Sequence, residues 1–318
     1  MLLLVVSSNA QKLVFNNDQT FNIVQFTDMH YVHGNSKSDT MLLAFERVLD
    51  AEKPDLIVLT GDIVISSPVK KAWDVITQFA IDREISFAVT LGNHDDEHGT
   101  TRTDLAELIT QYPYNVNRLR ENGFEYDLNN VVPIYGGKDG MKKKMNLYLI
   151  DSKAYSTLDG VGGYGWIPFE TINWYREQSV QFTRENNMQP VPALAFFHIP
   201  LPEYKTAFDD EKNVRYGVRR EKECAPELNS GMYLVMKEMG DVFGVFAGHE
   251  HVDYIVDYHD VALAYGCFSG WKTKYAPEIN GARVIVIKED KPEFDTWLHL
   301  LDGTIKDKVT YPKDFSKK

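Results

Sequence analysis

Five short apolar runs in this chain each lead directly into a residue that can bind a metal ion. The runs have the length and composition of buried strands, and segments between them, such as 41–51 and 72–81, have apolar residues at helical spacing. Strands that alternate with helices predict an α/β fold. The runs, with the residues that follow them, are 21–26 before Asp28 and His30, 56–59 before Asp62, 87–91 before Asn93 and His94, 193–197 before His198, and 242–246 before His249 and His251.

These strand ends predict a metal site. The carboxyl ends of strands in an open α/β sheet form the ligand crevice, so the side chains that follow them should converge. Imidazole and carboxylate groups suit Zn, Fe and Mn. A carboxylate such as Asp62 can bridge two ions. Glycines precede Asp62, Asn93 and His249, and they allow the backbone to turn sharply close to an ion.

The order of these motifs carries a family resemblance. The series Asp-x-His, Gly-Asp, Gly-Asn-His-Asp, His and Gly-His-x-His spans residues 28–251 and resembles the calcineurin-like metallophosphoesterase superfamily. Segments 92–97, 197–200 and 229–231 are similar to the branch that holds fungal phosphatases and plant relatives of purple acid phosphatases. The resemblance covers roughly residues 20–290. It implies two packed mixed β-sheets flanked by helices, a four-layer sandwich.

The resemblance also implies a role for each motif residue. Asp28, His30 and His251 would hold one metal ion, Asn93, His198 and His249 the other, and Asp62 would bridge them. His94 would lie beside the leaving group as general acid, and Asp95 would orient His94. Asn93 would also stabilise the charge on the substrate phosphate. The reaction implied is hydrolysis of a small-molecule phosphoester by a metal-bridging hydroxide, with Fe, Mn or Zn as the metals.

Two positions qualify this reading. Purple acid phosphatases have a metal-binding Tyr three residues after the motif Asp, where this chain has Ile65, which argues against a coloured iron–tyrosinate site. Arg102 follows the Gly-Asn-His-Asp motif in a polar loop. Its guanidinium could contact a phosphate oxygen, which makes it a candidate substrate-binding residue, or it could be a solvated charge.

Two other functions fit the same motifs. One is a phosphodiesterase that acts on cyclic nucleotides or phospholipid head groups, because the motifs alone do not separate monoesters from diesters. The other is a non-catalytic scaffold of the same fold. The complete ligand set argues against the scaffold, because such proteins usually lose metal ligands.

Several residues are expected to lie outside the chemistry. We expect the remaining histidines to be structural or exposed, the segment 160–166 to be a packed turn rather than the mouth of a pocket, and Lys142–Lys144 to cap a solvated loop. Cys224 and Cys267 could pair or remain thiols, since no Cys-x-x-C motif is present. The remaining histidines are His33, His98, His259 and His299.

The net charge and residues 1–10 allow predictions about the partners and the cellular location of the protein. The formal net charge of −12, without a basic tract, disfavours nucleic acid and anionic membranes as partners, and no protein partner is predicted. No run of about 18 apolar residues predicts a membrane span. Residues 1–10 resemble a shortened signal peptide, which predicts a periplasmic or secreted protein rather than a cytoplasmic one. Residues 11–318 are expected to form a single domain.

Overall fold

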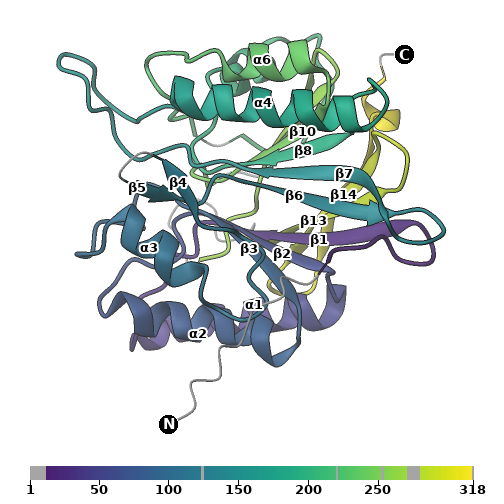
Figure 1. Cartoon of the computed structure of the whole chain (residues 1–318). Coiled ribbons are helices and arrows are strands. Elements are labelled where there is room, and N and C mark those ends of the chain that lie inside the picture. Colours follow the sequence, from purple (N-terminus) through teal and green to yellow (C-terminus); the bar gives the residue numbers. More distant parts are fainter. Residues whose placement is uncertain (1–11, 123–124, 220, 252–253, 271–279, 317–318) are drawn as a thin grey trace.

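The computed structural model describes residues 12–122, 125–219, 221–251, 254–270 and 280–316. Two β-sheets pack face to face in the centre, with α1 and α2 on one outer side and α4 and α6 on the other (Figure 1). The predicted four-layer α/β fold is therefore confirmed. The predicted signal segment 1–10 lies outside the described residues.

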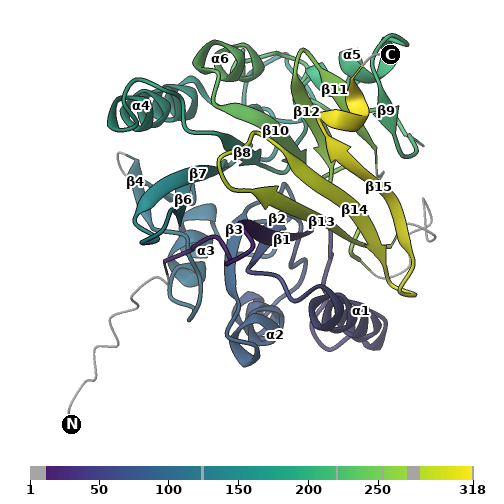
Figure 2. The same cartoon turned by 90° about the vertical axis from the view of Figure 1, so that its right-hand side faces the viewer.

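The first sheet joins strands from the two ends of the chain. Its strand order is β15-β14-β13-β1-β2-β3. β1 pairs in parallel with β2 and antiparallel with β13, so an early strand lies between an early and a late neighbour (Figure 2). The strands are β1 (Thr20–Phe26), β2 (Leu56–Thr60), β3 (Ser86–Thr90), β13 (Gly281–Lys288), β14 (Phe294–Leu300) and β15 (Ile305–Tyr311).

The second sheet has parallel strands at its centre. Its order is β6-β7-β8-β10-β12-β11-β9, and the pairs β7·β8, β8·β10 and β10·β12 are parallel. Its strands are β6 (Asn130–Gly136), β7 (Lys142–Leu149), β8 (Ala193–Phe196), β9 (Arg215–Tyr216), β10 (Val242–Ala247), β11 (Ile255–Tyr258) and β12 (Val261–Tyr265). A separate two-stranded sheet consists of β4 (Arg120–Asn122) and β5 (Glu125–Asp127).

The helices cover the outer faces of the two sheets. α2 shows why: Ala72, Trp73, Ile76 and Ala80 recur at helical spacing and are all buried against the sheet. The predicted helices at 41–51 and 72–81 lie within α1 and α2. The helices are α1 (Ser36–Glu52), α2 (Val69–Asp82), α3 (Arg102–Ile109), α4 (Phe169–Glu185), α5 (Glu203–Asp209), α6 (Met232–Met239) and the 3₁₀ helix η2 (Lys313–Phe315).

Three apolar layers hold the fold together. The layer between the sheets includes Ile23 of β1, Leu147 of β7 and Phe246 of β10. One outer layer joins the first sheet to α1, α2 and α3, and the other joins the second sheet to α4, α5 and α6. Full burial of a large apolar side chain contributes about 1.5–3 kcal/mol, so these layers supply most of the favourable free energy of folding.

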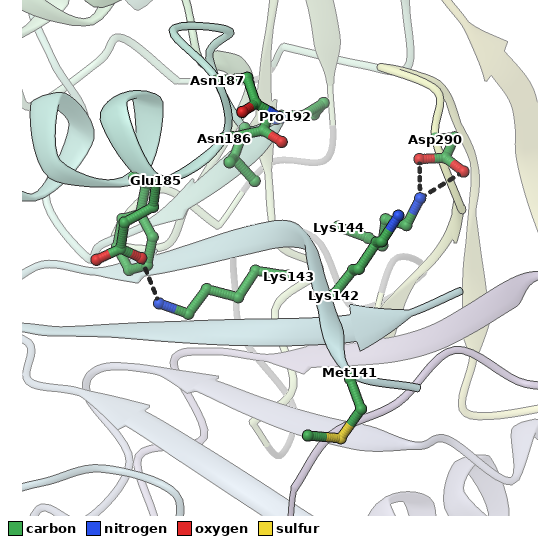
Figure 3. A pocket seen from close by; sticks show the side chains of 11 residues that line it. Met141, Lys142, Lys143, Lys144, Glu185, Asn186, Asn187, Pro192 and Asp290 are labelled. Atoms are coloured by element: carbon green, nitrogen blue, oxygen red, sulfur yellow. Dashed lines mark hydrogen bonds and ion pairs between the residues drawn. The ribbon is translucent and has the colours of Figure 1, made fainter. Parts of the chain in front are cut away.

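We expected Lys142–Lys144 to cap a solvated loop. They instead form the beginning of strand β7. They line a hollow of about 530 Å³ beside the end of α4 (Figure 3). Lys143 Nζ lies 2.8 Å from Glu185, and Lys144 Nζ lies 2.6 Å from Asp290. These carboxylates offset the lysine charges, and none of the predicted site residues lines this hollow.

Two further expectations concern cysteines and membranes. Cys224 is exposed and Cys267 is buried, and the two do not form a disulfide. Among the described residues, no helix is both long enough and apolar enough to cross a membrane.

Candidate metal centre

The carboxyl ends of the predicted strands meet where the two sheets face each other. Gln25 of β1 is fully buried and links the sheets there, because its Nε2 donates to Thr60 Oγ1 at 2.9 Å and to the Ala247 carbonyl at 3.2 Å. The His198 carbonyl accepts from Gly248 N at 3.0 Å, which joins the ends of β8 and β10. The loops that carry the motif residues are thus fixed to one another.

Asp28, His30 and His251 form the first of two clusters that could hold a metal ion. Asp28 Oδ1 lies 4.0 Å from His30 Nε2 and 3.7 Å from His251 Nε2. Asp28 is fully buried, whereas the two histidines are half-buried. The loop after β1 is held by the loop after β2, since Asp28 N donates to the Gly61 carbonyl and His30 N to the Asp62 carbonyl.

Asp62, His198 and His249 form the second cluster. His198 Nε2 lies 3.3 Å from Asp62 Oδ2 and 3.3 Å from His249 Nδ1. Asn93 belongs with this cluster, because its Oδ1 lies 3.2 Å from His198 Nε2. Ligand atoms around one ion with bonds of about 2.1 Å lie roughly 3–3.4 Å apart, so these spacings match a shared ion.

Asp62 lies between the two clusters. Its Oδ2 is 3.4 Å from His30 Nε2 of the first cluster and 3.3 Å from His198 Nε2 of the second. Its Oδ1 accepts a hydrogen bond from the backbone of His94 at 2.8 Å. The carboxylate that the sequence suggests as a bridge therefore contacts residues of both clusters.

The backbone of the site is strained. L-residues rarely adopt left-handed φ values, and each one costs roughly 1–2 kcal/mol. Gly92 shows how tightly the loops pack, because a Cβ there would lie 2.1 Å from Asp62 Oδ1. Strain of this kind gathers at functional sites. The candidate ligands whose backbone has a left-handed conformation are Asp28 (φ 51°), His30 (φ 47°), Asp62 (φ 53°) and His249 (φ 73°).

The donor atoms fit metal ions. Asp28 Oδ1 is buried and has no hydrogen-bond partner among the described residues, an arrangement that a bound cation would satisfy. His198 Nδ1 lies 2.8 Å from the Thr60 carbonyl, which fixes the tautomer with Nε2 facing the cluster. Carboxylate, imidazole and amide oxygen are suitable ligands for Fe, Mn and Zn.

The electrostatics of the site also favour cations. Burial would raise the pKa of Asp62, but His198 and His30 hold it well below its usual range. Burial would lower the pKa of His198, but the charges of Asp62 and Asp28 raise it to about 9. Burial, followed by the charge on His198, lowers the pKa of His249 to about 3. The buried carboxylates of Asp28 and Asp62 thus stabilise positive charge at the place where metal ions would bind.

We expected Asp95 to orient His94, but the structure gives its carboxylate other partners. Its carboxylate accepts four backbone hydrogen bonds, from Asp62 N at 2.8 Å, Gly92 N at 2.7 Å, Ile63 N at 2.9 Å and Val64 N at 3.2 Å. It is 1 % exposed, so these donors occupy it fully. Burial, followed by the charge of Asp62, raises its pKa. Asp95 instead fixes the turns that carry Asp62 and Asn93.

Arg102 joins neighbouring loops through an ion pair and backbone hydrogen bonds. Its Nη2 lies 2.6 Å from Asp151 Oδ1, and its Nη1 donates to the Gly92 carbonyl at 2.9 Å. A further bond reaches the Leu91 carbonyl, and the side chain is 17 % exposed. The predicted phosphate contact would require the guanidinium to leave these partners.

Sequence reasoning missed the residues that surround the motif side chains. His94 Nδ1 lies 2.7 Å from Glu97 Oε2, and a carboxylate three residues further along the chain was a usable signal. Tyr155 donates to Glu97, and Tyr164 packs its ring edge-on against His249 at 4.2 Å. Tyr164 lies in segment 160–166, so this turn contacts the site. The sequence raised segment 160–166, which contains Tyr164, as a possible pocket mouth but favoured a packed turn, and it did not mark Tyr155 for this position.

The four histidines outside the motifs belong to neither cluster. His259 is exposed in the turn after β11, and His299 is buried beside Glu52. His33 and His98 are half-buried, and neither belongs to either cluster. Their placement agrees with structural or exposed roles.

The fold and the two candidate metal clusters agree with the resemblance that the sequence motifs carry, and comparison with known proteins identifies the family. The sequence profile of the family named Calcineurin-like phosphoesterase matches residues 21–253. The chain therefore belongs to the calcineurin-like phosphoesterase family.

Proteins with similar sequences come from a plant and a yeast, and a protein with a similar fold comes from a fish. The chain is 34 % identical to "Probable inactive purple acid phosphatase 14" of Arabidopsis thaliana, over 82 % of this chain and 73 % of that protein. It is 32 % identical to "Phosphatase DCR2" of Saccharomyces cerevisiae, over 77 % of this chain and 46 % of that protein. The fold is similar to that of a dimetal phosphatase from Danio rerio, with a TM-score of 0.62 and 12 % identity over 91 % of this chain and 98 % of that one.

Proposed function

We propose that this protein hydrolyses small-molecule phosphoesters with the help of two metal ions. One observation supports this above the others: Asp62 Oδ2 lies 3.4 Å from a histidine of one cluster and 3.3 Å from a histidine of the other. A shared carboxylate keeps two cations close enough to act on one phosphoryl group. Family membership and the complete ligand set support the same assignment.

The proposed roles follow from where each side chain lies. When bound, the metals would lower the pKa of a water molecule and offset the charge of the phosphate. Asp28, His30 and His251 would hold one ion, while Asn93, His198 and His249 would hold the other. His94, whose side chain is 39 % exposed at the edge of the first cluster, would donate a proton to the leaving oxygen.

A non-catalytic role is the second candidate, because the names of three similar plant proteins include the word inactive. The complete ligand set of this chain supports catalysis instead. A diester substrate would need space on both sides of the phosphorus atom, and the monoester is the simpler proposal.

The test combines metal content with turnover. Elemental analysis of the purified protein should find about two metal equivalents per chain. Metal-free protein should then be assayed with Fe, Mn and Zn against a panel of phosphomonoesters and phosphodiesters. Two bound metals without turnover of any substrate would favour the non-catalytic role. The absence of bound metal would reject the two-metal assignment.

A further inference from the structure

A chain of hydrogen bonds connects His94 to Asn93 through Glu97 and Tyr155, neither of which is a proposed metal ligand. His94 Nδ1 lies 2.7 Å from Glu97 Oε2. The other oxygen of Glu97 accepts from the Tyr155 hydroxyl at 2.9 Å. That hydroxyl in turn accepts from Asn93 Nδ2 at 3.4 Å. The loop before α3 and the loop after β7 therefore meet at one tyrosine hydroxyl.

Glu97 determines which nitrogen of His94 carries the proton in the neutral ring. An ionised carboxylate only accepts hydrogen bonds, so the His94 nitrogen that faces Glu97 must be Nδ1–H. This leaves Nε2 as the nitrogen that can exchange a proton with a substrate. The His94 ring stands edge-to-face with His30 at 5.8 Å, which places it beside the first cluster.

Tyr155 determines the orientation of the Asn93 amide. The Tyr155 hydroxyl gives its proton to Glu97, so toward Asn93 it can only accept, and the amide nitrogen must face it. The amide oxygen then points to His198 Nε2, 3.2 Å away in the second cluster. Only the oxygen of an amide can bind a metal ion, so the opposite orientation would remove a ligand.

No other carboxylate in the motif can take over this task. Asp95 is adjacent to His94 but is bonded to four backbone amides. Asp96 Oδ2 pairs with Arg102 Nη1 at 3.6 Å. Glu97, with a half-exposed side chain, would be poorly fixed without its second bond, which Tyr155 supplies.

We infer that Glu97 and Tyr155 are positioning residues that orient, through one connected set of hydrogen bonds, the proposed general acid His94 and the proposed metal ligand Asn93. This inference rests on the proposed function. It makes the loop that carries Tyr155 part of the catalytic machinery, although that loop supplies no metal ligand.

The first test separates Glu97 from a purely structural residue. Glu97→Ala should reduce kcat/KM about 10–100-fold for alkyl phosphates, whose leaving groups need a proton, and much less for nitrophenyl phosphate. The effect should lie in kcat rather than KM, and Glu97→Asp should restore part of the loss. Equal losses for both substrates would overturn the positioning role of Glu97.

The second test changes only the hydroxyl of Tyr155. Tyr155→Phe keeps the ring and its stacking on Tyr164, but it releases both Glu97 and the Asn93 amide. Metal affinity at one of the two sites should fall about 10–100-fold, and the turnover of alkyl phosphates should fall as well. Tyr112→Phe is the matched control, because it removes a similar 2.8 Å bond to Asp74 on α2. Unchanged metal affinity in Tyr155→Phe would overturn the role of Tyr155.

A readout without catalysis separates this inference from the proposed function. In metal-free protein with ¹⁵N-labelled histidine, His94 should give an Nδ1–H signal, assigned by its loss in His94→Gln. The signal should disappear in Glu97→Ala while the melting temperature stays close to that of the wild type. Its persistence in Glu97→Ala would refute the inference. If the signal is lost in Glu97→Ala and the wild-type protein hydrolyses none of the substrates, the hydrogen-bond network would be established and only the hydrolase assignment would be rejected.

Discussion

At the scale of single residues, Asp62 connects the two candidate metal clusters. Its two carboxylate oxygens face His30, His198 and the backbone of His94. Asp62→Asn should abolish activity and reduce bound metal, because a neutral amide cannot compensate two cations. The measurements are metal equivalents by elemental analysis and kcat/KM for a phosphomonoester. Asp74→Asn, a half-exposed acid on α2, is the control. Full turnover with both metals retained in Asp62→Asn would refute the two-metal assignment.

The second residue-scale prediction concerns His94. If His94 is the general acid, His94→Ala should keep both metals and lose about 10²–10⁴-fold in activity toward substrates with poor leaving groups. The loss should be small for nitrophenyl phosphate, because nitrophenolate disperses its charge without a proton. His98→Ala, on the same loop but outside both clusters, is the control. A metal-ligand role predicts the opposite pattern, with metal loss and equal damage to every substrate.

The sequence was informative about residues that follow strands and uninformative about their partners. The placement of Asp28, Asp62 and His198 could be predicted because the carboxyl ends of strands converge. The partner of His94 could not, because three carboxylates, at 95, 96 and 97, follow it directly in the sequence. Only the folded backbone shows that four amides already occupy Asp95.

At the scale of elements, Arg102 and Asp151 connect the start of α3 to the loop after β7. The pair is 2.6 Å apart, and its side chains are 17 % and 3 % exposed. Arg102→Met should lower the free energy of unfolding at pH 7 by about 3–5 kcal/mol, because it leaves a buried carboxylate without its partner. Urea unfolding measures this difference. Arg83→Met is the control, since its partners Glu46 and Asp50 are exposed and such pairs contribute at most about 1 kcal/mol.

The same pair predicts a pH dependence. Burial would raise the pKa of Asp151, but Arg102 and then Lys153 lower it below its ordinary value. Because the folded-state pKa lies below the unfolded value of about 3.9, the pair contributes its full stability above that pH and loses it as the pH falls through the folded pKa. The stability difference between wild type and Arg102→Met should therefore shrink below about pH 4. A difference as large at pH 3 as at pH 7 would contradict this.

Elements with continuous apolar runs could be predicted, whereas short or mixed ones could not. β2 and β10 are buried along their whole length and read as uninterrupted apolar sequence. β14 alternates apolar residues with Asp295 and His299, and β9 has two residues, so neither stood out as an apolar run. Strands of this kind are specified by their neighbours in the sheet rather than by their own composition.

At the scale of the whole molecule, we propose that the protein is exported. The apolar stretch at the start and the small residues before Ala10 motivate this proposal. Cell fractionation should find the protein in the periplasm or the medium, and N-terminal sequencing should show cleavage near Ala10–Gln11. A cytoplasmic protein that still begins at Met1 would contradict export.

The pairing of distant strands is the part of the whole molecule that sequence did not reveal. The apolar pattern indicates that β1 and β13 are strands, but not that Val24 lies opposite Val284. Any buried strand of similar length would satisfy the same pattern, so the choice of neighbour depends on the packing of the complete sheet.

The position of β1 between β2 and β13 has a consequence for how the protein is made. When a ribosome has added His251, every proposed ligand exists, but β13, which begins at Gly281, does not. One edge of β1 then has unpaired amides and carbonyls, and the apolar layer between the sheets lacks Ile285 and Phe294. The nascent chain thus contains all the proposed metal ligands before the sheet that positions them is complete. Metal loading would follow the synthesis of β13, when this strand closes the sheet beside β1.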